Sequence, residues 1–317
     1  MIDLHVHSTA SDGTCSPAEL AERGRGFSVM AITDHDNCDG VDEFLSKSEA
    51  LNAVEPKSTG TRSGSANAPK RSNAQTLNHR LAGIELSVEP GEGYGKFHLL
   101  GLGIDPQHDG LRRFLRRILE GRHMRNERIL ARFAEIGIAI PPAEIATYAH
   151  GEVLARPHFA RWLMDHGYAT DIKTAFSMYL TPTSPVATNC YMTRYRPDPG
   201  EAFDVIHAAG GVAVMAHPRY WTKNPVLLRE GLAKLEARGL DGIEAVYQAN
   251  EPDETIDHLR AAKELNLCVT AGSDFHGANK PTITLGMEVD DEESFIAPFL
   301  ARLDQRRRCG PGKCPEA

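Results

Sequence analysis

The sequence predicts an α/β barrel of about seven strands that is interrupted by an inserted helical subdomain. Short apolar runs alternate with helical patterns in the first and last thirds of the chain, as is typical of a parallel sheet. Several of these runs end in histidine, aspartate or glutamate, as expected of strands that deliver ligands to one rim of a barrel. Between residues 110 and 209 the patterns are helical, with few strand signals.

The first predicted strand carries two histidines one residue apart. His5 and His7 point to the same side of a strand, whereas Leu4 and Val6 face the other side. Asp12 follows in a Ser-Asp-Gly turn, from which its carboxylate can reach back toward the histidines. Such a mixed nitrogen and oxygen set suits Zn, Mn or Fe. A lone His-x-His motif is more often a chance feature of a surface strand, so the metal-site interpretation depends on later residues.

More ligand-type residues follow or interrupt apolar runs along the chain. They are His35, Asp36, Glu85, His98, His217, Asp274 and His276. We expect strands to deliver these residues at their C-terminal ends, where they meet at one rim. Six of these seven residues, all but Asp36, are candidate metal ligands. Together with His5, His7 and Asp12 they make nine ligands that we expect to converge. This is more than one divalent ion needs, so the sequence predicts two or three ions that share Glu85 or a water as a bridge.

The elements before the insertion follow from local signals. Ser16, Pro17 and Glu19 form a capping box with proline at the first helical position, which predicts a helix to about Arg23. Residues 28–33 then predict a buried strand, and a second helix begins at about residue 41.

Residues 52–80 differ from the rest of the chain in composition. They are rich in Ser, Thr, Gly, Asn and Lys and poor in large apolar side chains, which predicts a disordered surface insertion. A basic tether that contacts RNA is the alternative. Residues 81–88 and 96–104 then predict two strands joined by a Gly-rich turn.

Residues 105–195 are predicted to form the helical subdomain. Its first helix is long, with an apolar stripe at helical spacing and several arginines. These arginines are Arg112, Arg113, Arg116, Arg117, Arg122, Arg125, Arg128 and Arg132. They predict either a solvated face or a track for phosphate or RNA, and the solvated face is the ordinary outcome.

Arg156 and His158 precede or begin another predicted helix, with Pro157 at the first helical position. A phosphate at this point would meet a guanidinium, an imidazole and the positive end of the helix together. A helix-capping role is the alternative for both residues.

The alternation of strands and helices resumes after residue 200. We expect helices at 201–209, 225–238 and 254–265, strands at 212–216, 242–246 and 268–271, and a closing helix after residue 286. Glu244 lies inside its strand, either as a support for a ligand or as a rim carboxylate. Residues 307–317 are basic and rich in Gly and Pro, which predicts a disordered tail.

Composition limits the class of protein. A chain of 317 residues with 41% hydrophobic residues can build one barrel and an insertion. The formal net charge of -8 argues against a general nucleic-acid binder. Polar residues occupy the place of a signal sequence, and no apolar run is long enough for a membrane span. We therefore expect a cytoplasmic protein with reduced cysteines, no membrane association and no obligatory protein partner.

The order His-x-His, Thr-Asp-His, Glu, His, His-Pro and Ser-Asp-x-His resembles the PHP (polymerase and histidinol phosphatase) superfamily. The segments Gly-Ile-Glu-Leu-Ser and Arg-Pro-His-Phe-Ala-Arg are most similar to its bacterial phosphoesterases that act on nucleoside 3',5'-bisphosphates and on short or 5'-phosphorylated RNA. The resemblance implies a distorted seven-stranded (β/α)7 barrel formed by residues 1–104 and 196–306. It also implies hydrolysis by a metal-bridged hydroxide with two or three divalent ions, Mn favoured over Zn or Fe.

The resemblance further assigns roles to residues. The catalytic set is His5, His7, Glu85, His217 and Asp274, and the substrate-binding set is Arg156, His158 and Asp36. Ser184 stands where the family usually has a lysine that faces a substrate phosphate, although Arg194 and Arg196 could restore the charge. A phosphatase for a small amino-alcohol phosphate of the histidinol phosphate kind is the alternative enzyme. A noncatalytic module, such as those attached to polymerases, is the alternative from another class.

Overall fold

A computed structural model describes residues 1–54, 78–89, 95–149, 151 and 153–309. Most of the insertion and the end of the tail expected from the sequence therefore lie outside the described residues. Where they are described, their edges are regular structure. Helix α2 (Val41–Val54) and strand β3 (His79–Val88) extend into the range 52–80, and helix α10 (Glu292–Cys309) extends into the range 307–317.

Seven strands form one sheet in the order of the sequence, which confirms the predicted fold class. Besides β3, they are β1 (Ile2–Asp3), β2 (Val29–Ile32), β4 (Phe97–Leu102), β5 (Val212–Met215), β6 (Gly242–Tyr247) and β7 (Cys268–Gly272). Only β4 runs against its neighbours, since β3–β4 and β4–β5 are antiparallel and the other pairs are parallel.

The first and last strands approach each other and nearly close the sheet into a barrel. Leu4 N donates to Ala271 O over 2.9 Å, and Asp274 N donates to His5 O over 2.8 Å. Val6 and Phe275 form an isolated parallel bridge. The residues that follow β1 are therefore held directly beside the residues that follow β7.

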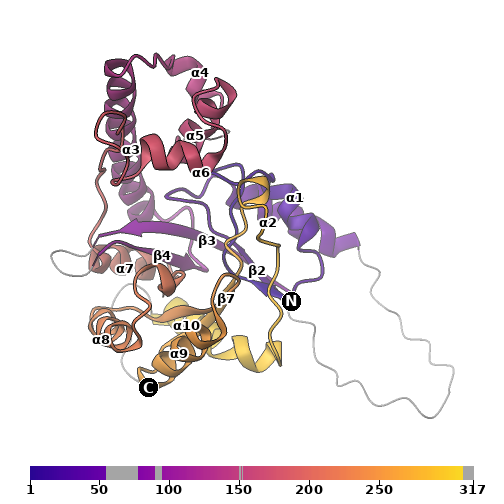
Figure 1. Ribbon diagram of the computed structural model, residues 1–317. Helices are drawn as coiled ribbons and strands as arrows, with labels where there is room; N and C mark the ends of the chain where they lie inside the picture. The colour runs from indigo at the N-terminus through magenta and orange to yellow at the C-terminus, as the bar shows by residue number, and fades with distance from the viewer. Residues whose placement is uncertain (55–77, 90–94, 150, 152, 310–317) are drawn as a thin grey trace, which may run out of the picture.

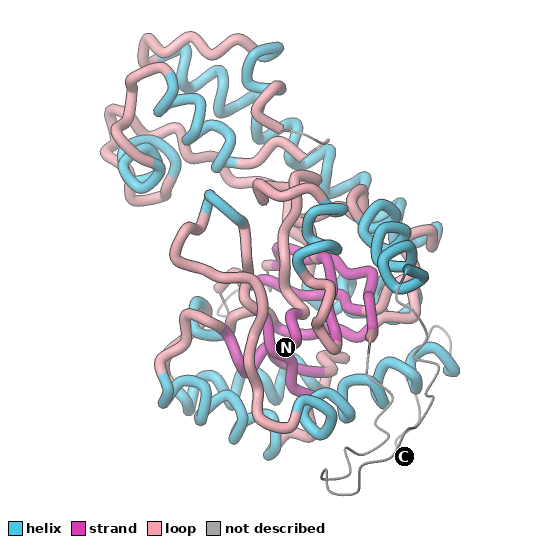
Figure 2. Tube along the Cα trace, turned by 90° about the vertical axis from the view of Figure 1, so that its right-hand side faces the viewer, coloured by secondary structure: helices cyan, strands magenta, loops and turns pink. Residues whose placement is uncertain are grey.

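Helices cover the outside of the barrel (Figures 1 and 2). In addition to α2 and α10 they are α1 (Pro17–Arg23), α7 (Pro199–Ala208), α8 (Pro225–Glu236) and α9 (Pro252–Glu264). The predicted capping box of α1 is present, because the Ser16 hydroxyl accepts from Glu19 N and the Glu19 carboxylate accepts from Ser16 N. No helix among the described residues is both long enough and apolar enough to cross a membrane.

A second group of helices stands away from the sheet (Figure 1). Helix α3 (Asp109–Glu135) rises from the barrel, and beside it lie α4 (Pro142–Ala146), α5 (Arg156–Asp165), α6 (Ile172–Ala175) and the π-helical turn η1 (Phe176–Leu180). The far half of α3 joins a separate apolar core in which the rings of Phe133 and Phe159 stack.

Helix α3 belongs to both parts of the molecule. Leu111, Phe114 and Ile118 in its first half pack into the barrel core, whereas Ile129 and Phe133 pack into the separate helical core. The packing boundary therefore falls inside α3 rather than at the residue 104/105 boundary expected from the sequence. A single helix couples the barrel to the helical subdomain.

Candidate metal centre

The structure brings all nine predicted ligands to one rim of the barrel. His5, His7, His35, His217, Asp274 and their neighbours follow the C-terminal ends of parallel strands, as predicted. His98 differs, because it is the second residue of β4. Since β4 is antiparallel, its N-terminal end lies at the rim where the parallel strands end.

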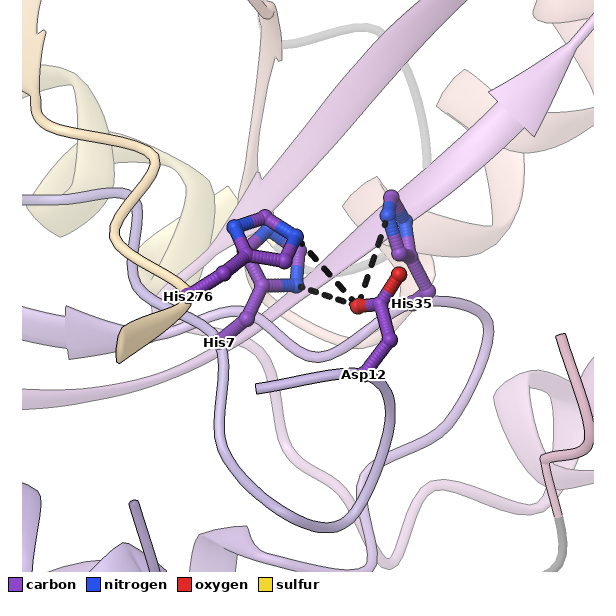
Figure 3. Close-up of side chains that lie close together, drawn as sticks. All are labelled: His7, Asp12, His35 and His276. Atoms are coloured by element: carbon purple, nitrogen blue, oxygen red, sulfur yellow. Dashed lines mark ion pairs between the residues drawn. The ribbon is translucent and has the colours of Figure 1, made fainter. Parts of the chain in front are cut away.

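Four overlapping groups of side chains have ligand atoms within 4.8 Å of one another. The groups are His7, Asp12, His35 and His276; His5, His7 and Asp274; His5, Glu85 and His217; and His35, Glu85 and His98. Figure 3 shows the first group, in which three imidazoles surround the Asp12 carboxylate. Asp12 Oδ1 lies 3.3 Å from His276 Nε2 and 3.9 Å from both His7 Nδ1 and His35 Nε2. The groups share members, as expected of a site for more than one ion.

Glu85 lies at the centre of the cluster and is fully buried. Its Oε1 is 2.7 Å from His98 Nδ1, 3.1 Å from His217 Nε2 and 3.4 Å from His5 Nε2. Its Oε2 is 2.8 Å from His35 Nδ1 and 3.2 Å from His7 Nε2. One carboxylate thus faces five imidazoles from both of its oxygens, an arrangement that suits a bridging ligand.

Several ligand atoms in the cluster lack the hydrogen bonds that buried polar atoms normally form. Glu85 Oε2, His35 Nδ1 and His7 Nδ1 are buried and have no hydrogen-bond partner among the described residues, although the first two atoms lie 2.8 Å apart. His5 Nε2 and His7 Nε2 face each other at 3.1 Å, where at most one proton fits between them. Buried polar atoms are normally paired. Lone pairs that converge without partners fit divalent ions bound by nitrogen and carboxylate oxygen.

The electrostatics keep the carboxylates of the cluster ionised. Burial opposes ionisation, but His35, His98 and His5 hold the pKa of Glu85 well below its usual value. Histidine neighbours likewise lower the pKa of Asp12 and of Asp274 against the effect of burial. Burial lowers the pKa of His98 to about 4, so its imidazole is neutral at physiological pH, which is the form that binds a metal ion.

Residues behind the ligands fix their orientation. Glu244 is fully buried, and its Oε1 lies 3.0 Å from His5 Nδ1 while its Oε2 accepts from His217 N over 2.6 Å. Asp34 accepts hydrogen bonds from the hydroxyls of Ser8 and Ser11 and so holds the loop that carries Asp12. A carboxylate on the far nitrogen of a ligand histidine sets its tautomer and ring direction. The structure therefore gives Glu244 a supporting role, one of the two alternatives left by the sequence.

The backbone at the rim adopts unusual conformations. His217 and Asp274 have φ values of 28° and 58°, in the left-handed region that costs a non-glycine residue about 1–3 kcal/mol. Gly272, the last residue of β7 and two residues before Asp274, lies in a space too small for any side chain, because an added Cβ would lie 2.2 Å from Glu244 Oε1 and 2.5 Å from His5 Cβ. Both features aim ligand side chains at the shared centre.

A cavity of about 440 Å³ opens beside the metal-ligand cluster. His35, Glu85, His98, His217 and Asp274 line one part of it. The remaining wall is basic and aromatic, and consists of Lys96, Phe97, Arg156, Pro182, Tyr191, Arg196, Tyr220, Trp221 and Lys280 with Ser87 and Ala216. A ligand that fills this cavity would contact both the metal-ligand cluster and the basic side chains of the wall, one of which, Lys280, lies beside Asp274.

The sequence-predicted substrate residues divide into two classes. Arg156 lines the cavity, where its Nη1 donates to Leu180 O and its guanidinium lies 5.3 Å from the Tyr191 ring. His158 does not line it, since its buried ring accepts from Ala155 N and caps α5, which is the alternative that the sequence left open.

Asp36 also lies away from the cavity, contrary to its predicted contact with substrate. It is fully buried and forms ion pairs with Arg122 and Arg194. Ser184 is buried as well, with its hydroxyl bound to Phe176 O, so this position does not present a side chain to the cavity. Of the two arginines that could replace the missing lysine, Arg196 lines the cavity and Arg194 binds Asp36.

Two residues that contact the Asp274 carboxylate were missed by reading the sequence. Lys280 Nζ lies 2.5 Å from Asp274 Oδ2, and the Tyr247 hydroxyl donates to the same oxygen over 3.1 Å. Lys280 follows His276 by four residues, so its nearness to the Ser-Asp-x-His motif was a usable signal. Tyr247 ends a neighbouring strand, and nothing in its local sequence distinguishes it from a core aromatic residue.

Comparison with known proteins identifies relatives of nearly the same length. Residues 3–113 match the family model described as PHP domain. The chain is 31% identical over 315 residues to a 3',5'-nucleoside bisphosphate phosphatase of Chromobacterium violaceum, covering 96% of this chain and 97% of the relative. It is 31% identical to a 5'-3' exoribonuclease of Haemophilus influenzae, covering 93% and 96%. A solved structure from Chromobacterium violaceum, described as an amidohydrolase with bound SO4 and no metal, has a TM-score of 0.76 at 29% identity and covers 96% of both chains.

Proposed function

Because this chain belongs to the PHP domain family and is a hydrolase of phosphate esters, we propose that it removes the 3'-phosphate from nucleoside 3',5'-bisphosphates. The observation that carries the proposal is the cavity with two chemically different ends. Its ligand cluster suits the phosphate that reacts, and Arg156 and Arg196, which line the same cavity, suit a second phosphate that does not react. A relative named for this activity matches the chain over nearly its whole length.

The cofactor in this proposal is two or three divalent ions, with Mn favoured. Four overlapping ligand groups built from nine residues exceed the requirement of one ion. Imidazole mixed with carboxylate suits Mn, Fe and Zn, and the carboxylates favour the harder Mn. Such ions, when bound, acidify a water for attack on phosphorus and neutralise phosphoryl oxygens.

The residues of the chain perform the remaining steps. Glu244 holds the His5 ring and the backbone of His217, so that both imidazoles present Nε2 to the centre. Arg156 and Arg196 bind the second phosphate and place the reacting phosphate at the ligand cluster. The aromatic side chains of Tyr220 and Trp221 on the cavity wall offer apolar contact for a nucleoside.

Short RNA with a 5'-phosphate is a second substrate class in the same proposal. It is favoured by the part of the cavity wall that the helical subdomain supplies through Arg156, Pro182 and Tyr191, and by a relative named as a 5'-3' exoribonuclease. An RNA 5' end would place its terminal phosphate against the same arginines. Hydrolysis would then occur at the next phosphodiester.

Three substrates distinguish the candidate functions. With Mn added, a nucleoside 3',5'-bisphosphate, a 5'-phosphorylated oligonucleotide and histidinol phosphate are compared by release of phosphate or nucleotide. We expect the first to have the highest kcat/KM, with measurable cleavage of the second. A preference for histidinol phosphate would overturn the proposal in favour of a small-molecule phosphatase, and no hydrolysis of any ester would indicate a noncatalytic module.

Arg156 provides a test of the second phosphate site. Arg156→Ala removes a charge-assisted contact, which is worth roughly a ten- to hundredfold loss in kcat/KM for the bisphosphate. An activated aryl phosphate has no second phosphate and should lose far less. Equal losses on both esters would instead place Arg156 at the reacting phosphate, and no loss on either would leave it a helix-start residue.

A further inference from the structure

Five arginines converge where α3 and the segment returning from the helical subdomain meet the barrel. They are Arg122 and Arg125 of α3, Arg156 at the start of α5, and Arg194 and Arg196 of the returning segment. Arg125 is 4% exposed and, like Arg122 and Arg194, has no part in the proposed chemistry. It does not line the cavity, but its electrostatic neighbours Arg156 and Arg196 do.

The other four arginines have partners. Arg122 and Arg194 share the Asp36 carboxylate, with Arg122 Nε 2.8 Å and Arg194 Nη2 2.6 Å from Asp36 Oδ2. Arg196 Nη1 lies 3.5 Å from the exposed Glu89, and Arg156 donates to a carbonyl. Among the described residues, the five arginines are thus matched by only two carboxylates, Asp36 and Glu89. Positive charge is therefore in excess where α3 and the returning segment meet the barrel.

Arg125 is the member without compensation. Its Nε and Nη2 are buried and have no hydrogen-bond partner within the described part of the chain. Burial, with Arg122, Arg194, Arg156 and Arg196 as neighbours, lowers the pKa of Arg125 to about 8. A guanidinium nevertheless stays protonated at neutral pH. An unpaired buried charge is costly unless a counter-charge arrives.

We propose that Arg125 sets the charge requirement of the cavity, acting from behind Arg156 and Arg196 to select ligands whose distal group is a phosphate dianion. This rests on the proposed function, because it concerns the phosphate that does not react. Arg156 and Arg196 line the cavity, so an anion bound there would contact members of the arginine group. In a medium of low dielectric constant, a charge set back from the surface still acts strongly on such an anion.

The proposal predicts that one substitution raises the stability of the ligand-free protein and lowers its activity. Without nucleotide, Arg125→Met removes an uncompensated buried charge and keeps most of the apolar volume, so the Tm should rise by roughly 2–4 °C. With a nucleoside 3',5'-bisphosphate, the same change should lower kcat/KM about tenfold, mainly through KM. A nucleoside 3'-monophosphate, which lacks the distal phosphate, should lose far less.

Two further variants control for charge and for folding. Arg128→Met removes an exposed arginine from the same helix and should change neither Tm nor substrate preference. Arg125→Lys keeps the charge and should retain most of the preference for the bisphosphate, even if Arg125→Met does not yield folded protein. These measurements use the purified full chain with its metal ions.

Stabilisation by nucleoside 5'-monophosphate, measured as a shift in Tm, gives a readout that does not need turnover. The shift should be smaller in Arg125→Met than in the wild type, and unchanged in Arg128→Met. The proposal is overturned if Arg125→Met lowers the Tm without ligand, loses equally on both esters, or responds to the 5'-monophosphate as the wild type does. Failure of the wild type to hydrolyse either ester would refute the proposed function, while the Tm comparison would still decide the role of Arg125.

Discussion

Asp36 is the residue on which the junction between barrel and helical subdomain most depends. It follows β2, its side chain is fully buried, and it binds Arg122 of α3 and Arg194 of the returning segment, whose side chains are only 6% and 5% exposed. Asp36→Asn retains the size of the side chain and an oxygen for the hydrogen bond from Ser87 N. It removes the charge that both guanidinium groups require.

The size of the effect follows from this burial. Solvent screens exposed ion pairs, so that they contribute little, but loss of one partner from a buried pair costs about 3–5 kcal/mol. At roughly 2–4 °C per kcal/mol for a chain of this size, the Tm should fall by roughly 6–20 °C. Asp36→Asn combined with Arg122→Gln should lose less than the sum of the two single changes, because the first removes the partner of the second.

The assay is thermal unfolding as a function of pH. Burial opposes ionisation of Asp36, but Arg194 and Arg122 hold its pKa well below the usual range, so its stabilising contribution is present above the unfolded pKa of about 3.9. That contribution is lost as the pH falls through the lower folded pKa. The difference in Tm between wild type and Asp36→Asn should therefore be full at pH 7 and shrink in strong acid. A difference of less than about 2 °C at pH 7, or one that does not change with pH, would refute the reasoning.

Three other changes test the site. Reconstitution with Mn should give two or three ions per chain by elemental analysis. Glu85→Gln should lower that number, because it removes the negative charge that five imidazoles share. An unchanged metal content in this variant would contradict the bridging role of Glu85. Glu244→Gln should weaken metal affinity by roughly 10–100-fold in a titration, because it alters the support of His5. Ser184→Lys should lower the free energy of unfolding, measured with denaturant, by roughly 2–4 kcal/mol, because the side chain at this position is buried. Improved activity without loss of stability would instead show that a lysine here can reach the cavity.

The order of elements and the convergence of ligand residues could be read from the sequence because both are local signals. The alternation of apolar runs predicted the strands and helices, and polar residues that end such runs predicted the rim. The direction of β4 had a less direct signal, namely a short Gly-rich turn between adjacent strands. Its antiparallel direction puts His98 at the start of a strand rather than at the end.

The partners of buried charges could not be predicted in this way. Asp36 resembles a site residue because it adjoins His35, yet it is the distant Arg122 and Arg194 that determine its role. The periodicity of α3 likewise does not separate buried from exposed arginines, since Arg122 and Arg125 face the junction while Arg128 faces solvent. Such pairings depend on how two segments far apart in sequence pack together, which a local pattern does not contain.

The contact between the first and last strands, β1 and β7, has a consequence for folding during synthesis. Asp274 and His276, which complete the ligand groups of His5, His7 and Asp12, are synthesised after them and are separated from them by most of the chain described here. Contacts so distant in sequence form late and slowly, because a long loop must close first. Tight metal binding therefore requires that both segments have been synthesised and have come together.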